Sequence, residues 1–499
     1  MKKIISLILT IILFTSFAVT TFGAEATDEN NLESIYETIN EIISWKNSDS
    51  GSECVIDDEL CNGAGTSVLD WFAFSAGRYG LDEDYAKYIA AAENYANSGS
   101  TEVITDYQRL SLAVLSCGGD LSQNGLLDRA VYSALSDDNL NGGLVNSRIF
   151  ALLLLDSENY EIPDEVNLSR SSLISQILSH SLENGSFALN GNTPDTDITC
   201  MAVQALAPYY NGGEFFTYTQ GDVEKSSTVR EVIDNALTYL SSVQLDDGTV
   251  PTWGKSTCES TAQTVITLCT MGIDPNSDER FIKNGHSLID GLLSYKKEDG
   301  GFAHTVSESE NSSDALATVQ TFYALVSYCR FENGYRSLYD FREEPDNTLR
   351  TQITELSDRI NKLETSDTAT VKILLSDYEK IPTSERKYIY NFYKLSDILT
   401  ANSIENTAGY TADELGTSKS GNGFITDVTV DNKLKTDGAS LSTVDENFSK
   451  LETNSSDENS QLQNGQNMSV LQIIIVILIG AAAVAVIILN HTVFKKKRN

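Results

Sequence analysis

The stretches that decide the fold are Asn184-Gly-Ser-Phe187, Asp247-Gly-Thr-Val250 and Asp299-Gly-Gly-Phe302, three copies of one short pattern. Each copy is typical of a tight turn, because Asn and Asp side chains hydrogen-bond to nearby backbone groups and glycine adopts a positive φ without strain. A variable loop follows each turn, and a polar residue then opens an apolar segment. A turn, a loop and a helix that recur along a chain predict stacked helical repeats.

Short apolar segments of this repeat are expected to form inner helices. They begin near Asp70, Asp106, Asn146, Asp197, Glu259 and Asp314. A carboxylate or amide at these positions suits a helix N-cap, and a carboxylate also suits the positive end of the helix dipole. Segments with apolar residues at three- and four-residue spacing alternate with them and predict outer helices. These outer segments cover about 31–46, 82–97, 122–135, 164–182, 228–243 and 278–296.

The repeat therefore predicts an all-α head over residues 27–341, in which six inner and six outer helices form six hairpins, enough to close a ring. No strand pattern is visible in this region. Residues 347–400 differ in character and predict a small helical bundle or stalk. Its first helix carries apolar residues four and three apart, a short heptad seam, at Leu349, Ile353, Leu356, Ile360 and Leu363. Residues 401–467 are rich in Ser, Thr, Asn, Asp and Gly and predict a disordered linker.

The two ends predict export and anchoring. Lys2 and Lys3 precede an apolar run, and Ala24-Glu-Ala26 supplies small residues at a cleavage site, so residues 1–26 have the pattern of a signal peptide. Residues 470–489 are apolar except for Gln472 and are long enough for a transmembrane helix. The tail at 490–499 is basic and is expected to stay in the cytoplasm. The head is then extracellular on a single-pass protein of the cell membrane.

Charge and cysteine content narrow the function further. The formal net charge of −36 gives a surface that repels the phosphates of nucleic acids, so no nucleic-acid partner is expected. Seven cysteines cannot all pair within one chain, and a small loop between Cys54 and Cys61 is one pairing the spacing allows. The chain has only four histidines and no CxxC motif, and this composition argues against a zinc site.

The turns also carry a family resemblance. Gln244-Leu-Asp-Asp-Gly248 with Trp253 resembles the Q-x-x-x-G-x-W repeat of squalene–hopene cyclases, and Tyr295 to Phe302 is a weaker copy. The head is thus similar to the terpenoid cyclase and protein prenyltransferase family, whose fold is an α/α toroid. The cobalamin carriers use a similar toroid to bind a ligand rather than to catalyse. The exported, anchored arrangement is more similar to toroid-bearing surface proteins of Gram-positive bacteria.

One segment resembles the catalytic motif of that family. Asp195-Thr-Asp-Ile-Thr-Cys200 is similar to D-x-D-D-T-A, in which the middle carboxylic acid donates a proton to an alkene. The resemblance implies Asp197 as the acid, with Asp195 beside it, but Ile198 replaces the last Asp and a polarising partner is lost. The alternative is that Asp197 caps an inner helix. The prenyltransferases bind zinc through an Asp, a Cys and a His. Cys258 and His304 are present in this sequence, but the D-x-C motif of that family does not accompany them.

A calcium site is a further candidate cofactor site. Asp137, Asn139 and Asn141 match the opening of an EF-hand loop, but the twelfth position is Arg148 instead of Glu. The same residues also suit an ordinary turn.

These patterns predict a membrane-anchored extracellular binding protein whose toroid head holds a corrinoid, a glycan or a polycyclic isoprenoid. The candidate ligand-binding residues are Phe187, Trp253, Phe302 and His304, which follow the three turns. The structural alternative is that these aromatics wedge the turns against the helices. A lyase or cyclase that acts on an isoprenoid through Asp197 is the second hypothesis, and an adhesin or spacer that contacts another protein is the third.

Overall fold

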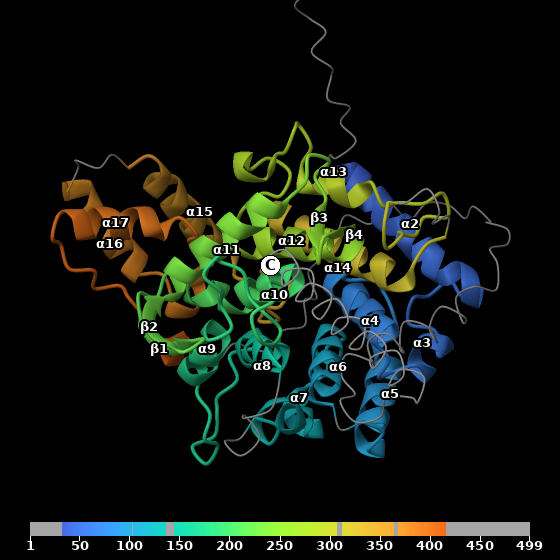
Figure 1. Cartoon of the computed structure of the whole chain (residues 1–499). Coiled ribbons are helices and arrows are strands. Elements are labelled where there is room, and N and C mark those ends of the chain that lie inside the picture. Colours follow the sequence, from blue (N-terminus) through green and yellow to red (C-terminus); the bar gives the residue numbers. More distant parts are fainter. Residues whose placement is uncertain (1–31, 102, 136–143, 307–311, 364–367, 416–499) are drawn as a thin grey trace, which may run out of the picture. The chain divides into compact units, whose positions relative to one another are not determined.

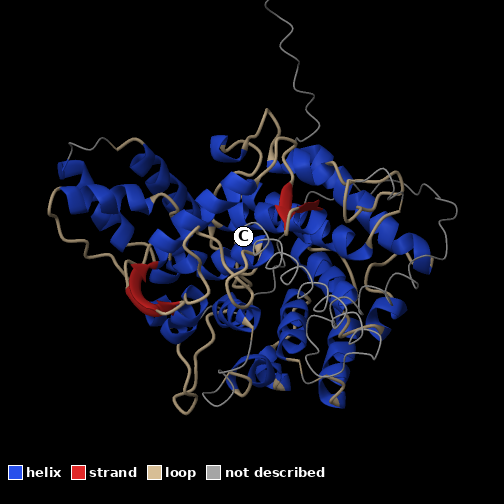
Figure 2. Ribbon diagram, in the orientation of Figure 1, coloured by secondary structure: helices blue, strands red, loops and turns tan. Residues whose placement is uncertain are grey.

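The computed structural model describes residues 32–101, 103–135, 144–306, 312–363 and 368–415. These residues are mainly helical, with two short β-hairpins (Figure 1, Figure 2). Within them no helix is both long enough and apolar enough to cross a membrane. The predicted signal peptide, the predicted span at 470–489 and the basic tail lie outside the described residues, as do Asp137, Asn139 and Asn141.

The predicted inner helices are all present, and each begins within a few residues of its expected start. They are α4 (Ser67–Tyr79), α6 (Ile104–Ser116), α8 (Val145–Ser157), α10 (Thr196–Leu206), α12 (Cys258–Thr270) and α14 (Ala315–Glu332). Every residue of α12 is buried, although the helix is rich in threonine. The hydroxyls of Thr261, Thr264, Thr267 and Thr270 donate to the carbonyl four residues earlier, so the helix satisfies its own polar groups.

The outer positions hold more varied elements. The longer ones, α2 (Leu32–Ser50), α5 (Tyr85–Ser98) and α11 (Val229–Val243), match their predicted ranges within a few residues. The other outer positions hold helices that are shorter than expected, together with short helical turns. They are α3 (Asp58–Asn62), α7 (Leu121–Asn124), the π-helical turn η1 (Asp128–Tyr132), α9 (Arg170–Leu178), the 3-10 turns η3 (Ala207–Tyr209) and η4 (Glu279–Phe281), and α13 (Leu288–Leu293).

The inner helices contact one another in a cycle. α4 packs on α6, α6 on α8, α8 on α10, α10 on α12 and α12 on α14, and α14 returns to pack on α4. The outer elements lie against this cycle: α5 packs on α6, α9 on α8, α11 on α10, α13 on α12 and α2 on α14. Side-chain pairs such as Cys200 with Thr264 and Gln204 with Thr267 advance together along α10 and α12, so these two helices run parallel.

The expectation of a head without strands is wrong at two places. β1 (Phe215–Gln220) pairs antiparallel with β2 (Val223–Thr228), and β3 (Val250–Thr252) pairs antiparallel with β4 (Lys255–Thr257). The burial of β1 alternates, as expected for a strand with one covered face. Each hairpin closes through a two-residue loop with a glycine, the kind of turn that matches strand twist.

The segment after residue 341 forms a helical bundle with its own core. It contains α15 (Asn347–Asn361), α16 (Thr368–Glu379), the 3-10 turn η5 (Thr383–Tyr388) and α17 (Phe392–Ala401). In the heptad seam, Leu356 and Ile360 are buried in this core and the other three residues pack partly against it. The predicted linker was placed from residue 401, but α18 (Ala412–Leu415) follows and Tyr410 is buried, with its hydroxyl donating to the Pro208 carbonyl. The ordered chain therefore extends at least to residue 415.

Candidate functional site

The three turns that identified the repeat have one structure. Gly185, Gly248 and Gly300 all adopt left-handed φ values, between +84° and +90°. A Cβ at Gly185 would meet the Asn235 carbonyl of α11, and one at Gly248 would meet the Ser287 carbonyl at the start of α13. The glycines therefore allow each turn to lie against the backbone of the next outer helix, which is a packing requirement as well as a turn requirement.

The residue two positions after each glycine is fixed by a threonine of the following inner helix. The backbone N–H groups of Phe187, Val250 and Phe302 donate to the hydroxyls of Thr199, Thr261 and Thr318, at 2.8, 3.0 and 2.9 Å. Phe187 and Phe302 are fully buried. This burial favours the alternative that both rings wedge the turns against the helices, and their role in binding a ligand stays a prediction.

The helix caps of α10 and α12 lie two residues before their predicted positions, whereas the cap of α14 is Asp314, as predicted. The N-caps of α10, α12 and α14 are Asp195, Thr257 and Asp314, whose side chains accept from backbone N–H groups three residues later. Asp197 and Glu259 instead lie in the first turn of their helices. The alternative that Asp197 caps a helix is therefore wrong, because a cap must precede the helix and accept from its N–H groups.

Two other predicted caps have different roles. Asp70 lies inside α4, is fully buried and accepts from Arg109, Tyr88 and the Gly65 N–H. Asp106 lies in the first turn of α6 and pairs with Arg109 at 3.0 Å. Both carboxylates bind one arginine, and the Asp70–Arg109 pair joins α4 to α6.

Asp197 is left with an unusual environment. Its Oδ1 atom is inaccessible to solvent and has no hydrogen-bond partner among the described residues. Burial raises the pKa of Asp197 to about 7; the charges of Asp195 and Glu259 add to this, while the Ser260 hydroxyl and His304 oppose it. Near neutral pH this carboxyl can either donate or accept a proton, which is the property of a general acid or base.

Glu259 and His304 form a pair beside Asp197. The Nδ1 atom of His304 lies 3.0 and 2.9 Å from the two carboxylate oxygens of Glu259. The backbone of His304 also accepts from the Cys258 N–H, which fixes the loop on the start of α12. The His304 side chain is 51% exposed and that of Glu259 is 11% exposed, so the pair reaches from the interior to the surface.

Trp253 stands at the rim of the same end. It is 65% exposed and occupies the first position of the two-residue loop between β3 and β4. Both loop residues have positive φ, +46° at Trp253 and +81° at Gly254. A two-residue turn of this kind favours Asn-Gly, and tryptophan in the left-handed region is strained. Because such strain costs stability, an exposed tryptophan at this position leads to the hypothesis that Trp253 has a function.

Amide side chains continue inward from these groups. Gln204 donates to the Gln263 and Thr267 side chains, and Gln263 donates to Gln320 and to the Tyr323 hydroxyl at 2.8 Å. Deeper in the cycle the space is occupied by aromatics: Trp71 contacts Phe74 and Tyr323 with ring centroids 5.1 and 5.3 Å apart. The interior between the inner helices is thus packed rather than hollow at this level.

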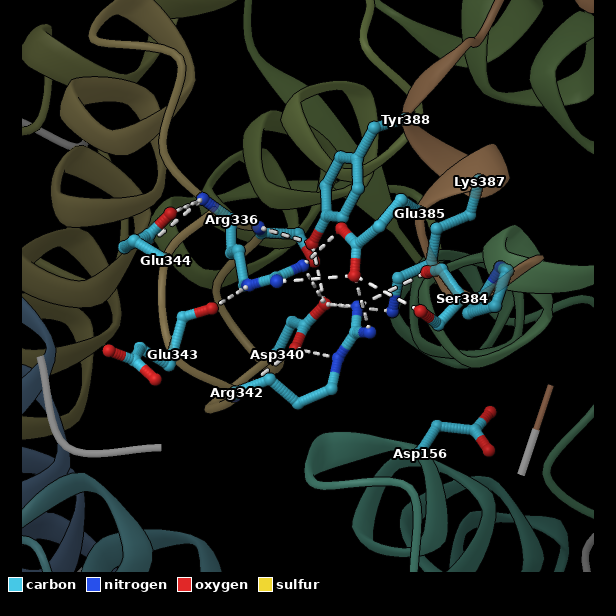
Figure 3. A network of polar contacts seen from close by, with 12 residues as sticks. Asp156, Arg336, Asp340, Arg342, Glu343, Glu344, Ser384, Glu385, Lys387 and Tyr388 are labelled. Atoms are coloured by element: carbon cyan, nitrogen blue, oxygen red, sulfur yellow. Dashed lines mark hydrogen bonds and ion pairs between the residues drawn. The ribbon is translucent and has the colours of Figure 1, made fainter. Parts of the chain in front are cut away.

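The opposite ends of the inner helices are closed by a network of buried charges (Figure 3). Asp340 accepts from Arg342 and from the Tyr388 hydroxyl, and its carboxylate lies 2.9 Å from the Lys387 ammonium. Glu385 binds both Arg336 and Arg342, at 2.7 and 2.9 Å. Burial alone would raise the pKa of Asp340, but Arg342, Lys387 and Arg336 hold it well below its usual range.

This network joins the bundle to the head and was not predicted from the sequence. Arg78 at the end of α4 donates to the carbonyls of Ser337 and Asp340. Asn211 after η3 donates to the Ile389 carbonyl. The charge run Arg336 to Glu344 was the available signal, because alternating charges in a segment flanked by buried aromatics suggest paired rather than solvated ions.

The remaining predicted sites find no support in the described residues. No group of three or more His, Cys, Asp or Glu side chains there is arranged to hold a metal ion. All seven cysteines are free thiols, so Cys54 and Cys61 form no disulfide. Cys258 is buried against the Thr321 hydroxyl at 3.2 Å.

No protein-family model matches the chain, and no curated protein matches it significantly. The site is therefore defined by its geometry. At one end it offers a carboxyl with one unpartnered oxygen, a histidine–glutamate pair and an exposed tryptophan. These groups can accept hydrogen bonds, exchange a proton and stack on a flat ring.

Proposed function

We propose that this chain is an exported, membrane-anchored protein whose head is an α/α toroid that binds a ligand at the end where the inner helices begin. The cyclic contacts of the inner helices, with outer helices against them, support the toroid. The signal-peptide pattern, the apolar stretch at 470–489 and the basic tail support the topology.

The gathering of Asp197, Glu259, His304 and Trp253 at this end carries the binding proposal. The other end is closed by ion pairs whose groups already satisfy one another. The first end, in contrast, presents an unpartnered carboxylate oxygen beside a pair that is partly open to solvent.

Among the ligand classes suggested by the sequence, we favour a glycan. Sugars present a flat apolar face that stacks on an exposed tryptophan and hydroxyls that donate to carboxylates and amides. A corrinoid or a polycyclic isoprenoid needs a deep cavity between the inner helices, where Trp71, Phe74 and Tyr323 already pack together.

The test is glycan binding by the full chain in detergent, measured by calorimetry against an array of neutral and amino sugars. Trp253→Ala is expected to weaken binding by about tenfold or more, because base- and ring-stacking contacts contribute about 1–3 kcal/mol. Phe215→Ala is the matched control, since Phe215 is 66% exposed on the other hairpin. Equal losses in both variants, or no glycan bound at all, would contradict the proposal.

An isoprenoid lyase or cyclase remains the second candidate, favoured by the raised pKa of Asp197 and its unpartnered oxygen. An acid with a pKa of about 7 can protonate a substrate near neutral pH. In that case Asp197→Asn abolishes product formation from an isoprenoid while the fold is retained. A glycan-binding protein without catalysis forms no product before or after the substitution.

A further inference from the structure

A cavity of about 490 Å³ lies where the ends of α12 and α14 meet the first helix of the bundle. Its volume falls within the range of about 300–1,000 Å³ that is usual for small-molecule sites. Residues from α14, from the loop at 333–337 and from α15 line it, so it exists only because the bundle packs on the head. It is remote in the fold from the groups on which the proposed glycan site rests, so either site can fail without the other.

Arg350 is the cation of this cavity with unused hydrogen-bonding capacity. Its Nε atom is inaccessible to solvent and has no partner among the described residues. A terminal nitrogen approaches the Pro345 carbonyl at 3.5 Å and Glu344 at 3.8 Å, both at or beyond the limit of a hydrogen bond. A guanidinium presents five donors in a fork that fits a carboxylate.

Glu344 does not compensate for this, because other groups already bind it. Arg330 donates to its carboxylate at 2.7 Å, and the backbone N–H of Arg336 donates at 3.0 Å. Arg336 is in turn occupied by Glu385 and the Glu343 carbonyl, and Figure 3 shows Arg336 between Glu344 and the buried network. Among the cations that line the cavity, Arg350 is therefore the one that can pair with a ligand with the least rearrangement.

The lining of the cavity also carries negative charge. Glu332 at the end of α14 and Asp358 in α15 are exposed, and no ion pair of either is found among the described residues. Apolar and aromatic side chains of Phe331, Tyr335 and Ile353 also line the cavity. Arg350 itself lies 5.3 Å from the centroid of the Tyr335 ring, which holds the guanidinium in place.

We propose that this cavity binds a small zwitterion with an apolar or aromatic side chain, of the amino-acid or dipeptide class. The ligand carboxylate pairs with Arg350, its ammonium group faces Glu332 and Asp358, and its side chain packs against Phe331 and Ile353. A purely anionic ligand would be repelled by the two exposed carboxylates, and a purely cationic one would leave the Arg350 nitrogen without an acceptor.

The test uses the full chain in detergent with the dipeptide alanylphenylalanine as the probe, and calorimetry as the measurement. Saturable binding is expected, weakened at least about tenfold when the dipeptide is N-acetylated or C-amidated, since each change removes one charge-assisted contact. Arg350→Gln is expected to weaken binding of the unmodified dipeptide to the same extent. Arg359→Gln is the matched control, because Arg359 lies on the same helix and pairs with Asp377 away from the cavity.

A second variant protects the test against misfolding. Thr354 is exposed on α15 and lines the cavity, so Thr354→Trp fills the cavity from its rim without disturbing the core. This variant is expected to melt like the wild type and to lose dipeptide binding. No heat of binding up to about 10 mM dipeptide, weaker than the usual range for specific small ligands, overturns the proposal. Equal binding by the wild type and either cavity variant overturns it as well.

Discussion

The two ends of the inner helices differ in how completely their charged side chains are paired. At the end where these helices finish, Asp340 and Glu385 are each bound by two or more cations or donors, and every member of the network is nearly inaccessible. At the end where they start, Asp197 has an oxygen without a partner and the Glu259–His304 pair is half open to solvent. The buried network around Asp340 and Glu385 therefore serves structure, whereas the groups around Asp197 retain capacity for a ligand or a proton.

The largest effect is expected in the buried network around Asp340 and Glu385. Asp340→Asn leaves Arg342 and Lys387 buried without a counter-charge, and such losses cost about 3–5 kcal/mol. The free energy of unfolding, measured in urea, should fall by this amount. Asp377→Asn is the control, since its partners Arg359 and Lys380 are largely exposed and such pairs contribute under about 1 kcal/mol.

The pKa of Asp340 also predicts how the cost of this substitution changes with pH. Its folded pKa lies well below its ordinary value of 3.8, so its stabilisation is present above about pH 4 and is lost as the pH falls through the folded pKa. Asp340→Asn should therefore cost less at about pH 2 than at pH 7. A cost that stays constant over this range would show that the loss arises from packing.

The second effect tests the repeat turns that position the starting end. Gly248 and Gly254 both have positive φ, but a Cβ at Gly248 would lie 2.2 Å from the Ser287 carbonyl, whereas one at Gly254 meets nothing within 4 Å. Gly254→Ala should cost about 1 kcal/mol from backbone strain alone. Gly248→Ala should cost about 1–3 kcal/mol more, because backbone must move. Equal melting temperatures for the two variants would refute the close approach.

The third effect sharpens the description of Asp197. Because its folded pKa is raised to about 7, the folded protein holds this proton more tightly than the unfolded chain, and stability falls as pH rises from about 4 to about 7. Asp197→Asn removes this dependence on pH. The stability of the variant relative to the wild type should therefore rise by about 2 kcal/mol between about pH 4 and about pH 7, after allowance for partial exposure. Urea unfolding of both proteins at several pH values measures it. Parallel stability curves would mean that the carboxyl ionises normally.

The smallest effect concerns the strained rim. Trp253→Asn places the residue that two-residue turns favour beside Gly254, and we expect a gain of about 0.5–1 kcal/mol in stability together with loss of glycan binding. The midpoint of thermal unfolding reads the first outcome and calorimetry reads the second. A variant that is less stable than the wild type would show that Trp253 serves the fold.

Much of the helical framework was predictable because it depends on local signals. The inner helices start within a few residues of their predicted positions, and the turn glycines have the predicted left-handed conformation. The N-caps were assigned two residues late in α10 and α12, because several polar residues precede each helix and only the backbone geometry distinguishes a cap from the first turn. The two hairpins were missed because each strand is short and lies between strong helical patterns.

The candidate site was only partly predictable. Asp197, Trp253 and His304 do lie toward one end, but Phe187 and Phe302 are buried, because the same turn that exposes the tip of the loop turns the next side chain inward. Glu259 was missed as a functional residue because its partner His304 is 45 residues away. The buried ion network was missed for the same reason, since its pairs join residues 336–342 to 384–388.

The amino-acid sequence by itself determined where the helices begin, where the chain turns and which glycines must adopt positive φ, because these properties depend on neighbours within a few residues. Only the tertiary structure decided which carboxylates are paired and which are left open, and that the last inner helix packs on the first. The physical reason is that burial and counter-charges come from residues far apart in the chain, so the pKa of Asp197 and the saturation of Asp340 arise only after packing.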